Sequence, residues 1–537
     1  MSDNLFLSHK PLNVQGEQIE TKFQTRQESL FGKESFSEIK EESMNKELSL
    51  GKSMREKIFT QKRLKQKIKN ENSNSNNEKI KDRLTIPTEL YYKCINLNVD
   101  IYQLKDIVIS FNSNDLAQKF AGLVGIRKLL CIPDDPPIEI ILEMNILPGL
   151  IELLGNSPVE FQYEALWCLI NITSGTDNQV KILKNEGGIE KILELLDHNL
   201  NEIKELAIWN IENIAIDSSK MQEFLIEKKI INKLITILSV NNNEAINIHC
   251  ISILKIILKN NVTCLSENVD AKMLINSISK IIMSIKFNPD NKDVYQLYND
   301  CFYLLSHISE KLKECKDYLL ENGVIPYILE VIRNNNNENN AYLILYGLKI
   351  IGNIISGNVN QTQKMLDYNI YDILKIHMFN HKKGIKKEAN WIISNIASDT
   401  EAHIKDLIDN GFFKLIYQIF EKEDRDVRIE AAWALCNFSQ IKDKNYILSL
   451  IDQGLLNAIY DCMRSSEIKE IAISIEALYN LLVFGKENEC NGKNLVALEL
   501  EKRGMLDVLE NLQFHRSELV YEKALKIIEN FFPVEEM

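Results

Sequence analysis

The chain has 537 residues, a formal net charge of −13, and 45% hydrophobic residues with only 20 Gly and 10 Pro. This composition favours an ordered, helix-rich protein, because hairpin-rich chains need more turn residues. The acidic charge argues against nucleic acid as the main partner, since phosphate binding is largely electrostatic, and it favours a basic partner. No apolar run reaches the roughly 18 residues that a membrane span requires, so we expect no membrane partner.

The first 83 residues lack a sustained apolar period and end in NENSNSNNEK, so they are predicted to be a flexible tail. Its start has no signal-peptide core. Residues 52–69 carry eight basic residues against one acid. This segment is either a solvated basic arm or a functional one. Lys62, Arg63 and Lys65 have the K-[KR]-x-[KR] form of a nuclear localisation signal, and they could fold back onto an acidic surface of the same chain.

Residues 84–537 contain a recurring segment in which a short polar turn opens a helix patterned for burial. The turns begin at Glu143, Asn185, Glu227, Glu321, Asp367, Asp409, Asp452 and Lys502. The first three are spaced by about 42 residues, the length of armadillo and HEAT units. The step from Glu227 to Glu321 is about twice as long, which predicts a degenerate repeat at residues 270–282. The pattern therefore predicts an all-α solenoid whose repeats stack into a superhelix with one concave wall.

Glycine often occupies the third position of these turns. The five cases are Gly187, Gly323, Gly411, Gly454 and Gly504. A glycine at this place predicts left-handed backbone, where a side chain would clash.

Four Trp/Asn pairs recur at a helical offset of four residues. They are Trp167 with Asn171, Trp209 with Asn213, Trp391 with Asn395, and Trp433 with Asn437. This offset puts both side chains on one helix face. An alternative is that the indoles are inter-repeat core and the amides end helices, but four pairs in register favour a repeated binding surface.

The chemistry of each pair suits an extended basic peptide. An Asn amide can donate to and accept from a peptide backbone. Neighbouring indoles form slots for Lys or Arg stems, with cation–π attraction of roughly 0.5–2 kcal/mol. The acids Glu164, Glu205, Glu388 and Glu430 are expected at the rim, facing the charged heads. Glu205, Trp209, Asn213 and Asp217 follow at four-residue steps, which predicts one row along a helix.

Catalytic and metal chemistry is not expected. The ten Cys are scattered without a CxxC pair, the eight His are isolated, and no Gly-rich phosphate loop is present. The Cys usage is typical of a reducing compartment. We therefore predict an intracellular protein that is not an enzyme and needs no cofactor.

Several further segments carry a family resemblance. With the Trp/Asn pairs, SGTDNQ at 174–179, GNIISGNVNQTQK at 352–364 and SELVYEKALKIIENFFPVEEM at 517–537 make residues 84–532 resemble importin alpha. The resemblance implies a right-handed superhelix of ten armadillo repeats that imports cargo bearing basic nuclear localisation signals. It further implies importin beta as carrier, a CAS-type export receptor bound by the last repeat, and shuttling between cytoplasm and nucleus.

The resemblance also implies two peptide sites. The N-terminal site comprises Trp167, Asn171, Gly175, Glu205, Trp209, Asn213 and Asp217. The C-terminal site comprises Lys349, Asn353, Glu388, Trp391, Asn395, Glu430, Trp433 and Asn437, with Lys349 and Asn353 expected to lie between the two sites.

The chain departs from the family pattern in places. Ser252 and Ile256 stand where the third repeat should carry Trp and Asn, Phe302 stands where the next repeat usually has Trp, and Val180 replaces a Thr. The tail is acidic at 37–48, where the family is basic. The C-terminal site is thus the better preserved, and the alternative function is an armadillo scaffold that has lost carrier binding or import.

Overall fold

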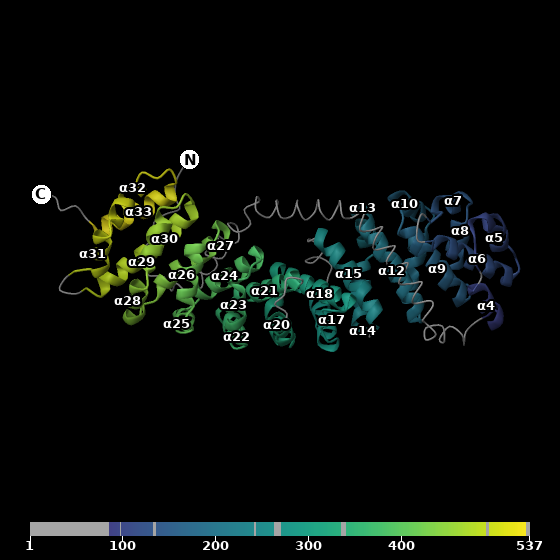
Figure 1. The fold of residues 1–537 in the computed structure, drawn as a ribbon, viewed down its shortest axis with the longest axis horizontal. Helices are drawn as coiled ribbons and strands as arrows, with labels where there is room; N and C mark the ends of the chain where they lie inside the picture. The colour runs from purple at the N-terminus through teal and green to yellow at the C-terminus, as the bar shows by residue number, and fades with distance from the viewer. Residues whose placement is uncertain are drawn as a thin grey trace, which may run out of the picture. The chain divides into compact units, whose positions relative to one another are not determined.

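The computed structural model describes residues 85–96, 98–132, 136–240, 243–261, 270–334, 340–489 and 493–532. Within these ranges the chain forms α-helices and short 3₁₀ helices joined by turns, with no β-strand (Figure 1). The all-α class that the sequence predicts is confirmed. The tail of residues 1–83, including Lys62, Arg63 and Lys65, lies outside the described residues.

The described residues form two compact units, one reaching to Ser277 and the other starting at Ile278. The first unit holds α4 (Thr88–Ile95), η1 (Ile101–Gln103), α5 (Leu104–Phe111), α6 (Leu116–Leu130), α7 (Ile138–Glu143), α8 (Leu147–Leu153), α9 (Val159–Thr173), α10 (Asp177–Asn185), α11 (Gly188–Glu194), η2 (Leu195–Asp197), α12 (Asn201–Asp217), α13 (Ser219–Glu227), α14 (Ile230–Val240) and α15 (Glu244–Asn260). The division falls within α17 (Ala271–Ser284), which forms the predicted degenerate repeat's helix.

The second unit continues the same alternation of short and long helices. It holds α18 (Lys292–Lys311), α19 (Cys315–Glu321), α20 (Ile325–Asn334), α21 (Ala341–Ile355), α22 (Val359–Leu366), α23 (Tyr371–His377), α24 (Lys383–Ala397), α25 (Glu401–Asp409), α26 (Phe412–Lys422), α27 (Arg425–Asn437), η4 (Phe438–Gln440), α28 (Lys444–Asp452), α29 (Leu455–Met463), α30 (Ile468–Glu487), α31 (Leu495–Lys502), α32 (Met505–Leu512) and α33 (Glu518–Phe531).

The longest helix of each repeat is its third, and third helices lie beside one another within each unit. In the first unit these are α6, α9, α12 and α15, and in the second they are α18, α21, α24, α27, α30 and α33. These ten helices match the number of armadillo repeats that the resemblance implies. Apolar side chains of these helices are buried; α12, for example, buries Ile203, Ile208, Ile211 and Ile214, whereas the last helix, α33, buries only Val520, Ala524 and Ile527 on one face.

The predicted left-handed turns are confirmed. Gly187, Gly323, Gly411, Gly454 and Gly504 all have positive φ angles, between 67° and 108°. The three turns without Gly use the same conformation at the same third position, with φ of 53° at Asn145, 59° at Lys229 and 53° at Asn369. The turn geometry therefore belongs to the repeat, and glycine is the residue that adopts it without steric cost.

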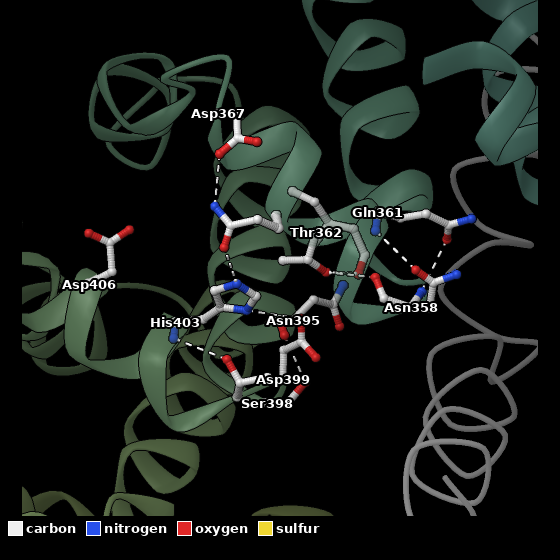
Figure 2. Close-up of polar contacts among 12 residues, drawn as sticks. Asn358, Gln361, Thr362, Asp367, Asn395, Ser398, Asp399, His403 and Asp406 are labelled. Carbon is white, nitrogen blue, oxygen red and sulfur yellow. Dashed lines mark hydrogen bonds and ion pairs between the residues drawn. The ribbon is translucent and has the colours of Figure 1, made fainter. Parts of the chain in front are cut away.

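Polar side chains also join the first helices of successive repeats. The side chain of Gln363 on α22 contacts both Asp367 and His403, which Figure 2 labels. Its Nε2 donates to Asp367 over 2.8 Å, and its Oε1 lies 3.0 Å from Nε2 of His403. The other ring nitrogen of His403 lies 3.0 Å from Asp399. This chain of contacts joins α25 to α22.

No described helix is long and apolar enough to cross a membrane.

Candidate functional site

The tryptophans of the first unit lie in a row of aromatic rings. Trp167 on α9 and Trp209 on α12 have ring centroids 6.0 Å apart and planes at 83°. Tyr163 stacks on Trp167 at 5.9 Å, and His249 of α15 stacks on Trp209 at 5.5 Å. The predicted neighbouring indoles are therefore present, and each is half-buried. The two indoles pack edge to face, with nearly perpendicular ring planes.

The paired asparagines are buried and bond to the fold. Nδ2 of Asn213 donates to the carbonyl oxygen of Ile170 and to Oγ1 of Thr173, both over 3.2 Å, which joins α12 to α9. Nδ2 of Asn171 donates to the carbonyl oxygen of Trp167 over 3.0 Å. Because the amide nitrogens are used within the fold, the amide oxygens are the atoms suited to a ligand donor.

Glu164 does not lie at the rim, so that expectation was wrong. It is 3% exposed on α9 and forms a buried ion pair with Arg127 of α6. Burial alone lowers the pKa of Arg127, but the adjacent Glu164 carboxylate outweighs it, and the net pKa is raised. Glu205 and Asp217 lie on α12 and are half-buried.

Gly175 has a clear structural role. A Cβ at this position would collide with the side chain of Gln179. Gln179 closes a capping box with Thr176 at the start of α10, and its Nε2 donates to Glu139 over 2.8 Å. The sequence GNVNQ repeats this arrangement in the second unit, where a Cβ on Gly357 would collide with Gln361.

The eroded third repeat contains a polar cluster. Ser252 Oγ on α15 donates to Glu212 of α12 over 2.7 Å, and His249 Nδ1 lies 2.6 Å from the same carboxyl group. The missing indole is thus partly replaced by the His249 ring, one turn earlier on α15. Val180 is buried in α10, whereas Thr362, its counterpart in α22, donates to the carbonyl oxygen of Ile355 over 3.1 Å.

The second unit carries the C-terminal site residues on α21, α24 and α27. Trp391 packs so closely over Gly352 that a Cβ there would collide with the indole. Asn437 donates through Nδ2 to the carbonyl oxygen of Ser394 over 3.0 Å. Asn395 is 7% exposed, and Trp391 and Trp433 are half-buried.

Hydrogen bonding fixes the register of the remaining third helices. Asn213 and Asn437 each bond to the residue just before the asparagine of the preceding helix. Asn353 bonds in the same way to Ser306, over 3.0 Å. The residue of α18 at the asparagine position is therefore His307, and the residue at the tryptophan position is Tyr303.

The expectation that Phe302 takes the tryptophan position was therefore wrong by one residue. Phe302 is fully buried in the core, and the half-buried ring is Tyr303.

Sequence reasoning also missed Asn480 on α30. Its Nδ2 donates to Ser439 Oγ over 3.3 Å, as Asn353 donates to Ser309 Oγ over 3.0 Å. Its near-constant spacing from Asn437 was the signal that could have found it.

The C-terminal site holds two acids close together. Burial raises the pKa of Glu388 to about 7, and the nearby Glu430 carboxylate adds to the rise, while Lys349 opposes it. Glu430 is only 1% exposed, so it is buried and does not lie at the rim as expected. A cationic ligand group here would meet one carboxyl group that is already partly protonated near neutral pH.

Comparisons with known proteins agree with this architecture. An armadillo/beta-catenin-like repeat model matches residues 134–174, and an atypical Arm repeat model matches residues 494–537. Importin subunit alpha-1b of Oryza sativa subsp. japonica is 27% identical over 448 residues, covering 81% of this chain and 79% of the relative. Importin subunit alpha-4 of Arabidopsis thaliana is 27% identical over 435 residues, covering 79% of this chain and 77% of the relative. The crystal structure of an engineered protein matches with a TM-score of 0.60 at 20% identity, covering 80% of this chain and 98% of that one, which supports the fold.

Proposed function

We propose that this chain, which belongs to the importin alpha family, is a nuclear import adaptor that binds basic nuclear localisation signals along its third helices. The relatives' shared name supports the adaptor role. The observation that carries the binding proposal is the right-angled pair Trp167 and Trp209, with Asn171 and Asn213 one turn further along the same helices.

We call the acid, aromatic ring and amide that follow one another at four-residue steps on a third helix a rung. In this proposal each of these residue types binds a different part of the ligand. The stem of a Lys or Arg lies in the corner between two indoles, where the ring faces attract its cationic end. The amide oxygens of Asn171 and Asn213 accept peptide N–H groups, because their nitrogens already donate within the fold. Glu205 and Asp217, on the same row as Trp209, attract the charged head groups.

The C-terminal site would bind a second basic cluster by the same chemistry. Trp391 and Trp433 supply the rings, Asn395 and Asn437 the amides, and Glu388 the acid. Lys349 and Asn353 would contact the ligand between the two sites, and Glu430 would act mainly through its effect on Glu388.

We further propose partners and location by family. Residues 1–83 would be a regulatory tail and residues 84–537 the repeat array, with 52–69 engaging importin beta and the last repeat a CAS-type export receptor. Lys62, Arg63 and Lys65 would compete with cargo in the same chain. The protein would then shuttle between cytoplasm and nucleus.

Calorimetry with a bipartite basic peptide tests the binding proposal. We expect micromolar or tighter affinity for the full chain, and tighter binding once residues 1–83 are removed. A tailless chain that binds no Lys/Arg-rich peptide would overturn the proposal.

A second candidate is an armadillo scaffold that has lost carrier binding. The acidic segment 37–48 and the replacement of the third tryptophan by Ser252 favour it. A pull-down through residues 1–83 that recovers importin beta would exclude this candidate, and failure to recover it would favour the scaffold.

A further inference from the structure

Helix α18 carries a row of side chains with the same spacing as the proposed N-terminal site. Asn299, Tyr303 and His307 follow one another at four-residue steps, as Glu205, Trp209 and Asn213 do on α12. The hydrogen bond from Asn353 to Ser306 independently puts His307 at the asparagine position. The row on α18 is therefore a complete rung in which each residue type has changed.

The aromatic pair of this rung has the same interplanar angle as the tryptophan pair, although Tyr346 lies three residues before the tryptophan position of α21, which is Lys349. Tyr303 and Tyr346 of α21 have ring centroids 5.3 Å apart and planes at 83°, the same angle as Trp167 and Trp209. His307 stacks on Tyr303 at 5.9 Å, and Tyr342 stacks on Tyr346 at 6.4 Å. Here too the two rings pack edge to face, and both are phenols.

The polar residues at the two ends of the row have unused hydrogen-bonding atoms. Asn299 Oδ1 and His307 Nε2 are buried, and the described residues provide no hydrogen-bond partner for either atom. Buried polar atoms are normally paired, so these two point to a ligand that donates hydrogen bonds. Burial lowers the pKa of His307, which favours a neutral ring able to accept one of them.

We infer that Asn299, Tyr303, His307 and Tyr346 form a further peptide pocket, which selects arginine over lysine. This inference rests on the proposed function. At the first place of the row, where α12 has the Glu205 carboxylate, α18 has the neutral amide of Asn299. A guanidinium is weakly hydrated, stacks on aromatic rings and offers several N–H donors, whereas an ammonium is strongly hydrated and needs a carboxylate more.

The two ends of the row would bind different parts of one residue. Asn299 and His307 are about 12 Å apart along the helix, from a rise of about 1.5 Å per residue. A guanidinium spans less than this, so it would bond Asn299 while a backbone N–H bonds His307. Lys311 and Lys349 lie near His307 together with Glu310, which also favours a neutral backbone group at that end.

Peptide binding to the full chain tests this pocket. The probe is a fluorescent bipartite basic peptide in which one linker position at a time carries Arg, Lys or Gln, measured by anisotropy. We expect one linker position at which Arg binds at least about threefold more tightly than Lys, as expected for a modest stacking difference. Equal affinities for Arg and Lys at every position overturn the inference and leave the proposed function standing.

Variants separate recognition from folding. Asn299→Asp should remove the preference for Arg over Lys by restoring a carboxylate. Tyr303→Ala should remove the extra affinity that Arg or Lys at this peptide position gives relative to Gln. Tyr303→Phe is the matched control, because it keeps the ring face and should keep the preference. If the preference for Arg survives both Asn299→Asp and Tyr303→Ala, another part of the surface causes it and the inference is overturned. A chain that binds no basic peptide overturns the proposed function as well.

Discussion

Nδ2 of Asn437 on α27 donates a 3.0 Å hydrogen bond to the carbonyl oxygen of Ser394 on α24. The same residue that would bind a peptide therefore also holds two neighbouring third helices together. This double use explains why an amide is tolerated at a site that is only 7% exposed. It also means that loss of binding in an asparagine variant must be separated from loss of stability.

Asn437→Ala is expected to destabilise the fold by about 1–3 kcal/mol, because a buried hydrogen bond is lost. Urea unfolding measures this. Gln440→Ala on the adjacent 3₁₀ helix is the matched control, with a smaller expected change, because it removes the 3.3 Å bond that Gln440 Nε2 donates to Asn437 Oδ1 but leaves the bond from Asn437 to Ser394 in place. An Asn437→Ala variant with an unchanged midpoint would show that the bond to Ser394 does not stabilise the packing of α27 on α24.

The buried pair Arg127 and Glu164 should couple strongly. Glu164→Leu alone leaves a buried guanidinium without its carboxylate and is expected to cost about 3–5 kcal/mol. The double variant Arg127→Met with Glu164→Leu should recover most of this loss, since it removes both charges. A double-mutant cycle by thermal unfolding checks the coupling, and additive losses would contradict it.

The two peptide sites should contribute unequally. Trp391→Ala with Trp433→Ala should weaken binding of a monopartite basic peptide at least as much as Trp167→Ala with Trp209→Ala. The reason is that the row of the first unit ends at Ser252 and His249, which replace a further indole. Calorimetry on both double variants decides this, and dominance of the N-terminal pair would show that the His249 ring compensates fully.

Glu388 should make stability depend on pH. Its pKa is raised from 4.5 to about 7 in the folded chain, so between these values the folded state holds a proton that the unfolded state releases. Stability should therefore fall as pH rises from about 4.5 to about 7 and then level off. Glu388→Gln should remove this component, which is measured as the difference in unfolding free energy between the two proteins across that range. An identical pH profile for both would contradict the raised pKa.

The turn before α26 should require glycine. Gly411 has a φ of 79°, and a left-handed conformation costs other residues roughly 1–2 kcal/mol. Gly411→Ala is thus expected to destabilise the protein by about 1 kcal/mol although no atom blocks a Cβ there. Gly384 in α24 is the control, because it has equal space and an ordinary φ, so Gly384→Ala should be neutral or stabilising. Equal effects of the two changes would rule out the turn conformation as the cause.

The sequence by itself determined the repeat and its turns. Apolar periodicity and the spacing of about 42 residues predicted the helices and the degenerate repeat at α17, and glycine predicted the left-handed third position of five turns, because these follow from local backbone preference and from burial of one stripe per helix. That Asn145, Lys229 and Asn369 adopt the same conformation was visible only in the structure. The positions of the four Trp/Asn pairs on third helices were predictable for the same reason.

Only the tertiary structure decided how neighbouring helices meet. Phe302 and Tyr303 are adjacent aromatic residues, and nothing local tells which one faces the core; the bond from Asn353 to Ser306 settles it. Glu164 resembles the other acids in sequence, but its burial beside Arg127 depends on a residue of α6 that lies 37 positions earlier. Such contacts join different repeats, and their register is set by side-chain packing between helices, which a period along the chain does not contain.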